Sequence, residues 1–167
     1  MGLDMEIRHN GCEVIYMRKE NAIRNWVAEH LEGFQDNGLT NFPKEKFEEL
    51  IDTMHDVITE GGIEDFYNEY VEYCNCEKED DDDKWNKIWH KWEAFVTNGG
   101  ERYKTFCEIA KENFPSSSGF FFGSTEYDVF YISQLIVNLR KFKEFYDELI
   151  ESDEEWDEGT VEYWEWY

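Results

Sequence analysis

The sequence predicts an all-α protein, a compact bundle of five or six helices with at most a minor β element. Six segments carry apolar residues at helical spacing, and Gly, Pro or Asn residues separate most of them. The 167 residues include 13 Phe, 10 Tyr and 7 Trp, enough to build a packed core despite the high charge. We therefore expect one helical domain over residues 1–150 and an acidic, aromatic C-terminal segment over residues 151–167.

Three helices are predicted in the first half of the chain. The first covers residues 18–32 and ends before Gly33, and the second begins at Pro43 and ends at Glu60. The third covers residues 63–74, after a Gly-Gly pair. Their apolar faces are predicted to consist of Ile23, Trp26, Val27 and Leu31, then Phe47, Leu50, Ile51, Met54 and Ile58, then Ile63, Phe66, Tyr67, Tyr70, Val71 and Cys74.

Three more helices are predicted in the second half, over residues 84–97, 101–113 and 127–150. An Asn-Gly-Gly sequence separates the first two, and Pro115 with a serine run precedes the last. The last helix is the longest, and its apolar residues are Phe130, Ile132, Leu135, Ile136, Leu139, Phe142, Phe145 and Leu149.

The segments between the helices carry little strand signal. Residues 77–83 are almost entirely acidic, which predicts a solvated loop. Only Cys12–Met17 and Gly119–Phe122 are candidates for strands.

The formal net charge of −24 restricts the partners of this protein. Residues 31–83 carry −15 and residues 144–167 carry −11, whereas residues 84–143 carry +3. An anionic surface disfavours direct contact with nucleic acid or anionic lipid, and the chain has no apolar run long enough to span a membrane. A basic protein is the partner that this charge favours.

The second predicted helix carries carboxylates at four-residue intervals, namely Glu48, Asp52, Asp56 and Glu60. Neighbours at this spacing lie on one face, with Cβ atoms about 5–6 Å apart. The third predicted helix extends the pattern with Asp65, Glu69 and Glu72. Two interpretations remain open: a stripe that mimics the phosphates of nucleic acid, or a surface that only keeps the protein soluble.

The C-terminal segment alternates acidic with aromatic residues and includes Trp164 and Trp166. Trp is a favoured anchor of protein interfaces, so one interpretation is a partner-binding arm. The alternative is a segment that packs its rings against the helical domain.

Two sequence motifs resemble those of a family of small phage and prophage proteins. Residues 16–26, Tyr-Met-Arg-Lys-Glu-Asn-Ala-Ile-Arg-Asn-Trp, resemble the family's opening motif, although the family usually has Trp where this chain has Met17. Residues 118–128, Ser-Gly-Phe-Phe-Phe-Gly-Ser-Thr-Glu-Tyr-Asp, resemble its second motif. Residues 61–113 and the acidic C-terminus depart from the family. The resemblance implies a phage origin and the host cytoplasm, and it assigns no catalytic residues.

The two motifs also define a candidate ligand pocket. Basic side chains of the first motif and polar side chains of the second would converge on a small polar or anionic ligand; the residues are Arg18, Lys19, Asn21, Ser124, Thr125, Tyr127 and Asp128. The alternative is structural: Asp128 pairs with Arg18, Ser124 or Thr125 caps the last helix, and the Phe run fills the core.

No metal, cofactor or catalytic residue is predicted. Cys74 and Cys76 could be combined with His55 or His90 as a zinc site, but the paired spacing of structural zinc ligands is absent, and Asp80–Asp83 lacks the calcium-loop pattern. The sequence therefore predicts a phage-encoded, non-enzymatic inhibitor of a basic, nucleic-acid-binding host protein, a DNA mimic acting against host defence. The alternatives are a small-ligand binder or enzyme that uses the region of Arg18 and Asp128, and a structural or interaction protein of the phage.

Overall fold

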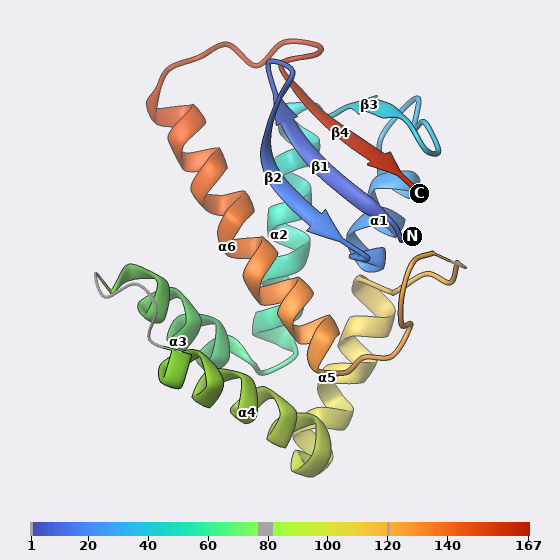
Figure 1. Cartoon of the computed structure of the whole chain (residues 1–167). Coiled ribbons are helices and arrows are strands. Elements are labelled where there is room, and N and C mark those ends of the chain that lie inside the picture. The colour runs from blue at the N-terminus through green and yellow to red at the C-terminus, as the bar shows by residue number, and fades with distance from the viewer. Residues whose placement is uncertain (1, 77–81, 120) are drawn as a thin grey trace.

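The computed structural model describes residues 2–76, 82–119 and 121–167 and is mostly helical, with one four-stranded antiparallel sheet (Figure 1). The helices are α1 (Asn21–His30), α2 (Lys44–Glu60), α3 (Glu64–Asn75), α4 (Asp82–Asn98), α5 (Gly100–Asn113) and α6 (Val129–Glu151). The strands are β1 (Asp4–His9), β2 (Cys12–Arg18), β3 (Leu39–Asn41) and β4 (Val161–Trp166). The predominantly helical character is confirmed, but the predicted all-α class is wrong because the sheet is more than a minor element.

The helices follow the predicted apolar spacing, with corrected ends. The first helix begins at Asn21 because the residues up to Arg18 belong to β2. The last begins at Val129, and its N-cap is Asp128 rather than Ser124 or Thr125. The predicted acidic loop 77–83 lies outside the described residues at positions 77–81, and Asp82 and Asp83 form the first turn of α4.

The sheet has the order β2-β1-β4-β3, so strands from the two ends of the chain pair at its centre. The strand candidate Cys12–Met17 is confirmed as most of β2. Described residues 119, 121 and 122 form no strand, so the Gly119–Phe122 candidate is wrong there. The sequence predicts neither β1 nor β4. β4 lies inside the sheet, between β1 and β3. The C-terminal segment thus joins the sheet instead of extending from a helical domain.

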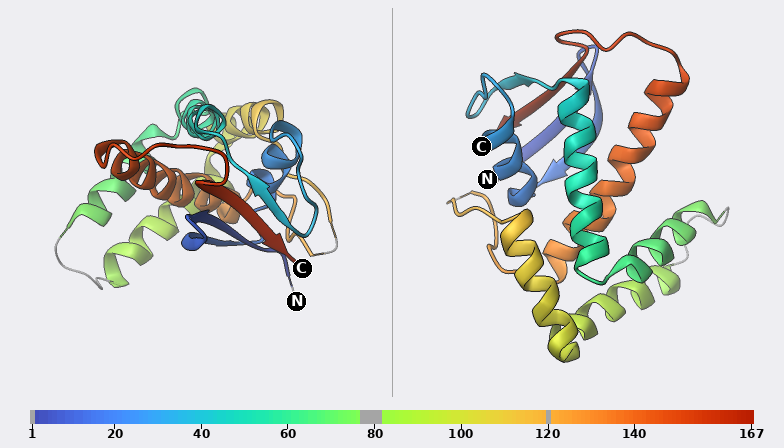
Figure 2. Two further views of the ribbon diagram at one scale, coloured as in Figure 1. Left: turned by 90° about the horizontal axis from the view of Figure 1, so that it is seen from above. Right: turned by 180° about the vertical axis from the view of Figure 1, so that it is seen from behind.

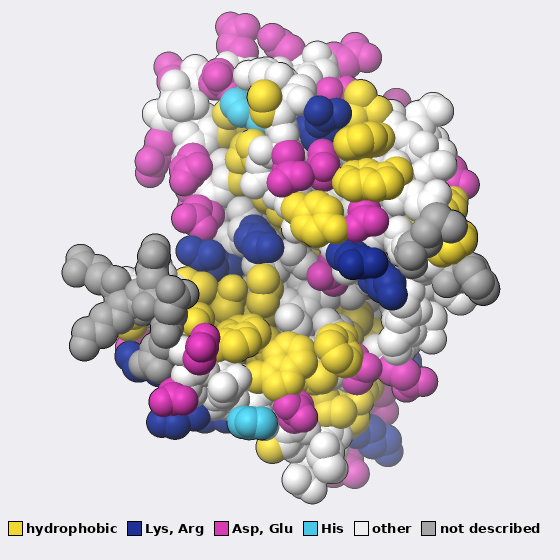
Figure 3. Space-filling view, in the orientation of Figure 1, with side chains coloured by type: hydrophobic (Ala, Val, Ile, Leu, Met, Phe, Trp, Pro, Cys, Tyr) yellow, Lys and Arg dark blue, Asp and Glu magenta, His cyan; other side chains and the backbone are white. Residues whose placement is uncertain are grey.

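One face of the sheet packs against α1, α2 and α6, as the view from above shows (Figure 2). Alternate side chains of β1 and β4, including Met5, Ile7 and Tyr163, point to this face and are fully buried. The opposite face carries no helix in the described part of the chain. Figure 3 shows aromatic side chains on it, interspersed with both signs of charge.

Candidate functional site

The two motif regions meet through the side chain of Asn21, which is almost fully buried. Its amide nitrogen donates to the carbonyl oxygens of Phe122, at 3.1 Å, and Ser124, at 2.6 Å. The Ser117 hydroxyl donates back to the Asn21 carbonyl, at 3.3 Å. Asn21 therefore holds residues 122–124 against the start of α1, although about 100 residues separate them in sequence.

Helix α6 completes this junction through Gln134. The side-chain oxygen of Gln134 accepts hydrogen bonds from the backbone N–H groups of Ala22, at 3.0 Å, and Ile23, at 3.2 Å. These N–H groups belong to the first turn of α1, where no intrahelical acceptor exists. Gln134 therefore caps the N-terminus of α1 in place of Glu20, whose side chain makes no cap hydrogen bond.

A cavity of about 420 Å³ lies beside this junction. Its charged and polar lining comes from both motif regions and includes Arg18, Lys19, Glu20, Ser124, Glu126 and Asp128. The backbone of Lys19 has a φ of 58°, in the left-handed region that non-glycine residues seldom adopt. This turn carries the chain from β2 into α1 and places Arg18, Lys19 and Glu20 along one cavity wall.

The structure divides the seven predicted pocket residues into three groups. Arg18, Lys19, Ser124 and Asp128 line the cavity, whereas Asn21 supports it. Thr125 and Tyr127 do not line it. The Thr125 carbonyl accepts from the Ser116 hydroxyl at 2.9 Å, and the Tyr127 carbonyl accepts from the Tyr103 hydroxyl at 2.7 Å. The Tyr127 hydroxyl also accepts from the Ser116 N–H at 3.2 Å, so both residues hold the loop before α6 and do not face the cavity.

Arg18 and Asp128 share the cavity without forming an ion pair recorded among the described residues. The Arg18 guanidinium lies 3.8 Å from a carboxylate oxygen of Asp4. The Asp128 carboxylate accepts from the backbone N–H groups of Phe130, at 3.0 Å, and Tyr131, at 3.2 Å, and caps α6. The cavity therefore contains a cation held at its rim and a carboxylate occupied by a helix end.

Glu20 is the cavity residue that sequence reasoning missed. Burial raises the pKa of its carboxyl from 4.5 to about 7, while a hydrogen bond with Asn138 and the charge of Lys141 oppose the rise. The sequence carries no signal for this, because Glu20 looks like one more acidic residue near a helix start. Asn138 and Lys141 lie more than 100 residues away and approach only in the folded chain.

The raised pKa of Glu20 predicts a pH-dependent stability. Between pH 4.5 and about 7 the folded state holds a proton that the unfolded state releases, so stability falls as pH rises through this window. We expect Glu20→Gln to remove this pH dependence. At pH 8 the free energy of unfolding of the variant should exceed that of the wild type by up to about 3 kcal/mol. Urea unfolding at pH 5 and pH 8 measures the free energy of unfolding of each protein. Glu126→Gln, which removes an exposed carboxylate, is the control. Parallel pH profiles for wild type and Glu20→Gln would contradict the prediction.

Three of the four acids in the predicted α2 stripe lie on an open surface. Asp52, Asp56 and Glu60 are exposed, and none of the three has a recorded ion pair among the described residues. Glu48 is half-buried and accepts a hydrogen bond of 2.6 Å from the hydroxyl of Tyr146 on α6. This hydrogen bond is the main reason that the pKa of Tyr146 rises to about 12. The free stripe therefore consists of three carboxylates.

The proposed extension onto α3 is mostly neutralised. Asp65 lies 2.6 Å from the guanidinium of Arg102, and Glu69 lies 2.7 Å from the ammonium of Lys91. Glu72 is exposed and borders a surface groove between α3 and α4. Sequence spacing placed these three acids on one face but contained no information about the cations that α4 and α5 bring to it.

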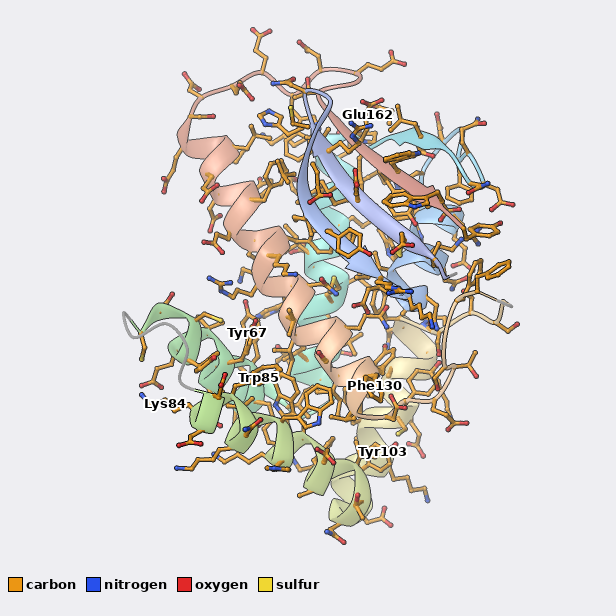
Figure 4. All side chains as sticks on the ribbon, viewed as in Figure 1. Tyr67, Lys84, Trp85, Tyr103, Phe130 and Glu162 are labelled. Carbon is orange, nitrogen blue, oxygen red and sulfur yellow. The ribbon has the colours of Figure 1, made fainter. Side chains whose placement is uncertain are left out.

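Trp164 and Trp166 lie on the face of the sheet that no described helix covers. Both are half-buried, and their ring centroids are 4.5 Å apart. The guanidinium carbon of Arg8 sits 5.0 Å from the Trp164 ring centroid, a cation–π distance. Figure 4 shows Glu162 of the same strand near the top of this face. The two rings belong to a strand and not to a free arm.

Comparison with known proteins provides no evidence on the family or function of this chain. No family model, curated protein or solved structure matches this chain. Within residues 2–76, 82–119 and 121–167, no group of three or more His, Cys, Asp or Glu side chains is placed to hold a metal ion. None of the described helices is long and apolar enough to cross a membrane. The resemblance to phage proteins stays a prediction.

Proposed function

We propose that this protein is an acidic, non-enzymatic binding protein whose partner is a basic, nucleic-acid-binding protein. The observation that carries the proposal is the free stripe of Asp52, Asp56 and Glu60, exposed on one face of α2 without recorded cation partners in the described chain. In contrast, the neighbouring acids Asp65 and Glu69 are paired. An uncompensated row of like charges costs folding free energy, which a binding role would explain.

The spacing of the stripe suits a protein that normally binds phosphates. From Asp52 to Glu60, α2 advances about 12 Å, with one carboxylate about every 6 Å. Rigid presentation matters, because a fixed array of charges costs less conformational entropy on binding than a disordered tail does. α2 is held by buried Leu50, Met54 and Ile58, so the stripe lies on a packed element.

The biological setting follows from the motif resemblance alone. A phage-encoded protein acting in the host cytoplasm would inhibit a host defence nuclease, a restriction enzyme or a transcription regulator. The test is a pull-down from host lysate at low and high salt, followed by competition of the captured protein with its own DNA. DNA should displace the acidic protein, and binding should weaken as salt screens charges beyond about 8 Å.

The stripe itself is tested by the triple change Asp52→Asn, Asp56→Asn and Glu60→Gln. We expect the association rate with the captured partner to fall about 10-fold or more at low salt, because exposed charges steer encounter. The free energy of unfolding should stay unchanged or rise slightly, since like charges four residues apart are removed. Surface plasmon resonance measures the rates.

A matched triple change on α5 separates the stripe from total charge. Glu101→Gln, Glu108→Gln and Glu112→Gln removes the same three charges from exposed positions on another helix. The proposal requires this control to bind nearly as fast as the wild type. Equal losses in both triple variants would mean that net charge, and not the α2 stripe, drives association.

A second candidate function is favoured by the cavity between the motif regions. Its lining combines Arg18 and Lys19 with the proton-holding carboxyl of Glu20, which suits a small polar ligand that carries both a donor and an acceptor. A thermal-shift screen of small organic ions at pH 7 tests it. A ligand that stabilises the wild type but not Glu20→Gln would place binding in this cavity, and a screen without stabilising compounds would remove the candidate.

A further inference from the structure

Strand β2 is an edge strand, and no strand of the described chain pairs with its outer side. In the order β2-β1-β4-β3 its neighbour is β1. The Lys19 N–H donates across the sheet to the Leu3 carbonyl at 2.8 Å. Because hydrogen-bonding directions alternate along an antiparallel strand, the N–H and C=O groups of Tyr16 and Arg18 point away from β1.

The free edge faces a groove of about 680 Å³ between β2 and α6. Figure 1 shows β2 as the strand nearest α6, with the helix running along its outer side. The strand side of the groove consists of Val14–Tyr16 of β2 and His9 of β1. The helix side consists of residues three or four apart on one face of α6, among them Lys141, Phe145 and Glu148.

We propose that this groove binds an extended, basic peptide segment of a partner protein, which adds to β2 as a further strand. Main-chain hydrogen bonds from the Tyr16 edge would give affinity, and the helix side of the groove would select side chains. The inference goes beyond the proposed function, because the groove shares no residue with the α2 stripe.

The groove matches a short extended segment in length and in polarity. From Lys141 to Ser152, the C-cap of α6, the helix side of the groove advances about 16 Å, the length of about five strand residues. Apolar contact is available from Val14 and Tyr16, 41% and 44% exposed, and from half-buried Phe145. Alternate side chains of an added strand would meet these apolar groups, and the intervening ones would lie over the rim.

The charge of the rim favours basic side chains. Three glutamates line the groove, namely Glu144, Glu148 and Glu154. Its lining also includes the cation Lys141 and the imidazole of His9. Glu144 is paired with Arg140 at 3.1 Å, and Glu154 lies 2.5 Å from His9. Glu148 is exposed with no ion pair recorded in the described chain, so it is the carboxylate most available to a Lys or Arg.

The same charge disfavours a second copy of this chain as the occupant. Pairing two β2 edges would bring the glutamates of both rims together, and each chain carries a net charge of −24. Like-charge contacts across an interface cost free energy and suppress the wrong partner. The same glutamates would attract the Lys or Arg side chains of a basic segment.

Selection of a random heptapeptide library on the immobilised full chain tests the proposal. We expect selected peptides to carry Lys or Arg at alternate positions. Against the best peptide, Tyr16→Pro should weaken binding at least 10-fold, because proline removes the N–H that faces the groove and leaves the pairing with β1 intact. Tyr16→Val keeps that N–H and should lose less than about 3-fold. Both variants lose the hydroxyl that donates to Asp4, so the comparison isolates the backbone.

A second pair of variants tests the charge. Glu148→Lys should weaken the peptide severalfold, and Glu108→Lys, the same change at an exposed site on α5, should not. The α2 triple variant should bind the peptide normally, so failure of the groove and failure of the stripe are separate results. Acidic selected peptides, equal binding by Tyr16→Pro and Tyr16→Val, or a dimer in sedimentation that Tyr16→Pro abolishes would each overturn the proposal.

Discussion

Replacing Arg24 with methionine is expected to lower the free energy of unfolding by about 3–5 kcal/mol, because it leaves a buried carboxylate without its cation. Glu165 is fully buried on the inner face of β4. Arg24 donates to it through Nε, at 3.2 Å, and Nη2, at 3.3 Å. The Asn37 N–H, at 3.1 Å, and the Tyr163 hydroxyl, at 2.7 Å, complete its hydrogen bonds.

The pKa of Arg24 shows the same balance of forces. Burial alone lowers the pKa of the guanidinium, but the hydrogen bonds and the charge of Glu165 outweigh burial and raise it. The charged pair is therefore the stable form inside the fold. Removing one partner loses this compensation, whereas removing both would not leave an isolated charge.

Urea unfolding at pH 7 measures the loss, and a double-mutant cycle identifies its cause. Arg24→Met combined with Glu165→Met should recover much of the stability lost in Arg24→Met alone. Arg140→Met is the control, since its partner Glu144 is exposed to solvent and the pair should contribute less than about 1 kcal/mol. Additive effects of the two buried changes would contradict the ion-pair account.

Replacing Phe47 with alanine is expected to cost about 3–5 kcal/mol through the cavity left in the core. Phe47 is fully buried on α2, with ring centroids of Phe42, Phe142 and Trp156 within 5.1, 5.5 and 5.4 Å. These rings come from the approach to α2, from α6 and from the connection to β4. Phe47 therefore joins the helices to the segment that feeds the sheet.

The matched control is Phe130→Ala, which removes the same atoms from a ring that is 65% exposed. Figure 4 shows Phe130 on the same side of the molecule as Trp85, and its ring centroid lies 5.6 Å from that of Trp89. We expect this variant to lose less than about 1.5 kcal/mol, the upper range for an aromatic pair. Denaturant unfolding compares the two, and similar losses would mean that the aromatic cluster around Phe47 is not a close-packed core.

The sequence alone predicted the helices, because each buries one continuous apolar stripe. α2 shows this best: Phe47, Leu50, Met54 and Ile58 are all buried as their spacing requires. It also placed Arg18 and Asp128 in related motifs, and both line one cavity. Exposure of Asp52, Asp56 and Glu60 could be predicted for the same reason, since they lie opposite the apolar stripe.

Only the tertiary structure decided the sheet. β4 alternates acidic with aromatic residues, but both faces of the strand carry aromatic rings, and Glu165 points inward while Trp164 and Trp166 point outward. Hydrophobic alternation is hidden when a charged residue is buried, and this burial is stable because Arg24 arrives from α1, 141 residues earlier in the chain. Pairing of β1 with β4 joins the two ends of the chain, a contact that local spacing does not encode.

The electrostatic character of individual acids was likewise decided by the fold. Glu20, Asp65 and Asp52 look alike in sequence, yet Glu20 holds its proton to about pH 7, Asp65 is paired with Arg102, and Asp52 is exposed. The pKa and the availability of a carboxylate depend on burial and on charges within a few ångströms. Those neighbours come from distant segments, so composition determines that the protein is anionic and tertiary structure determines which carboxylates remain free to bind.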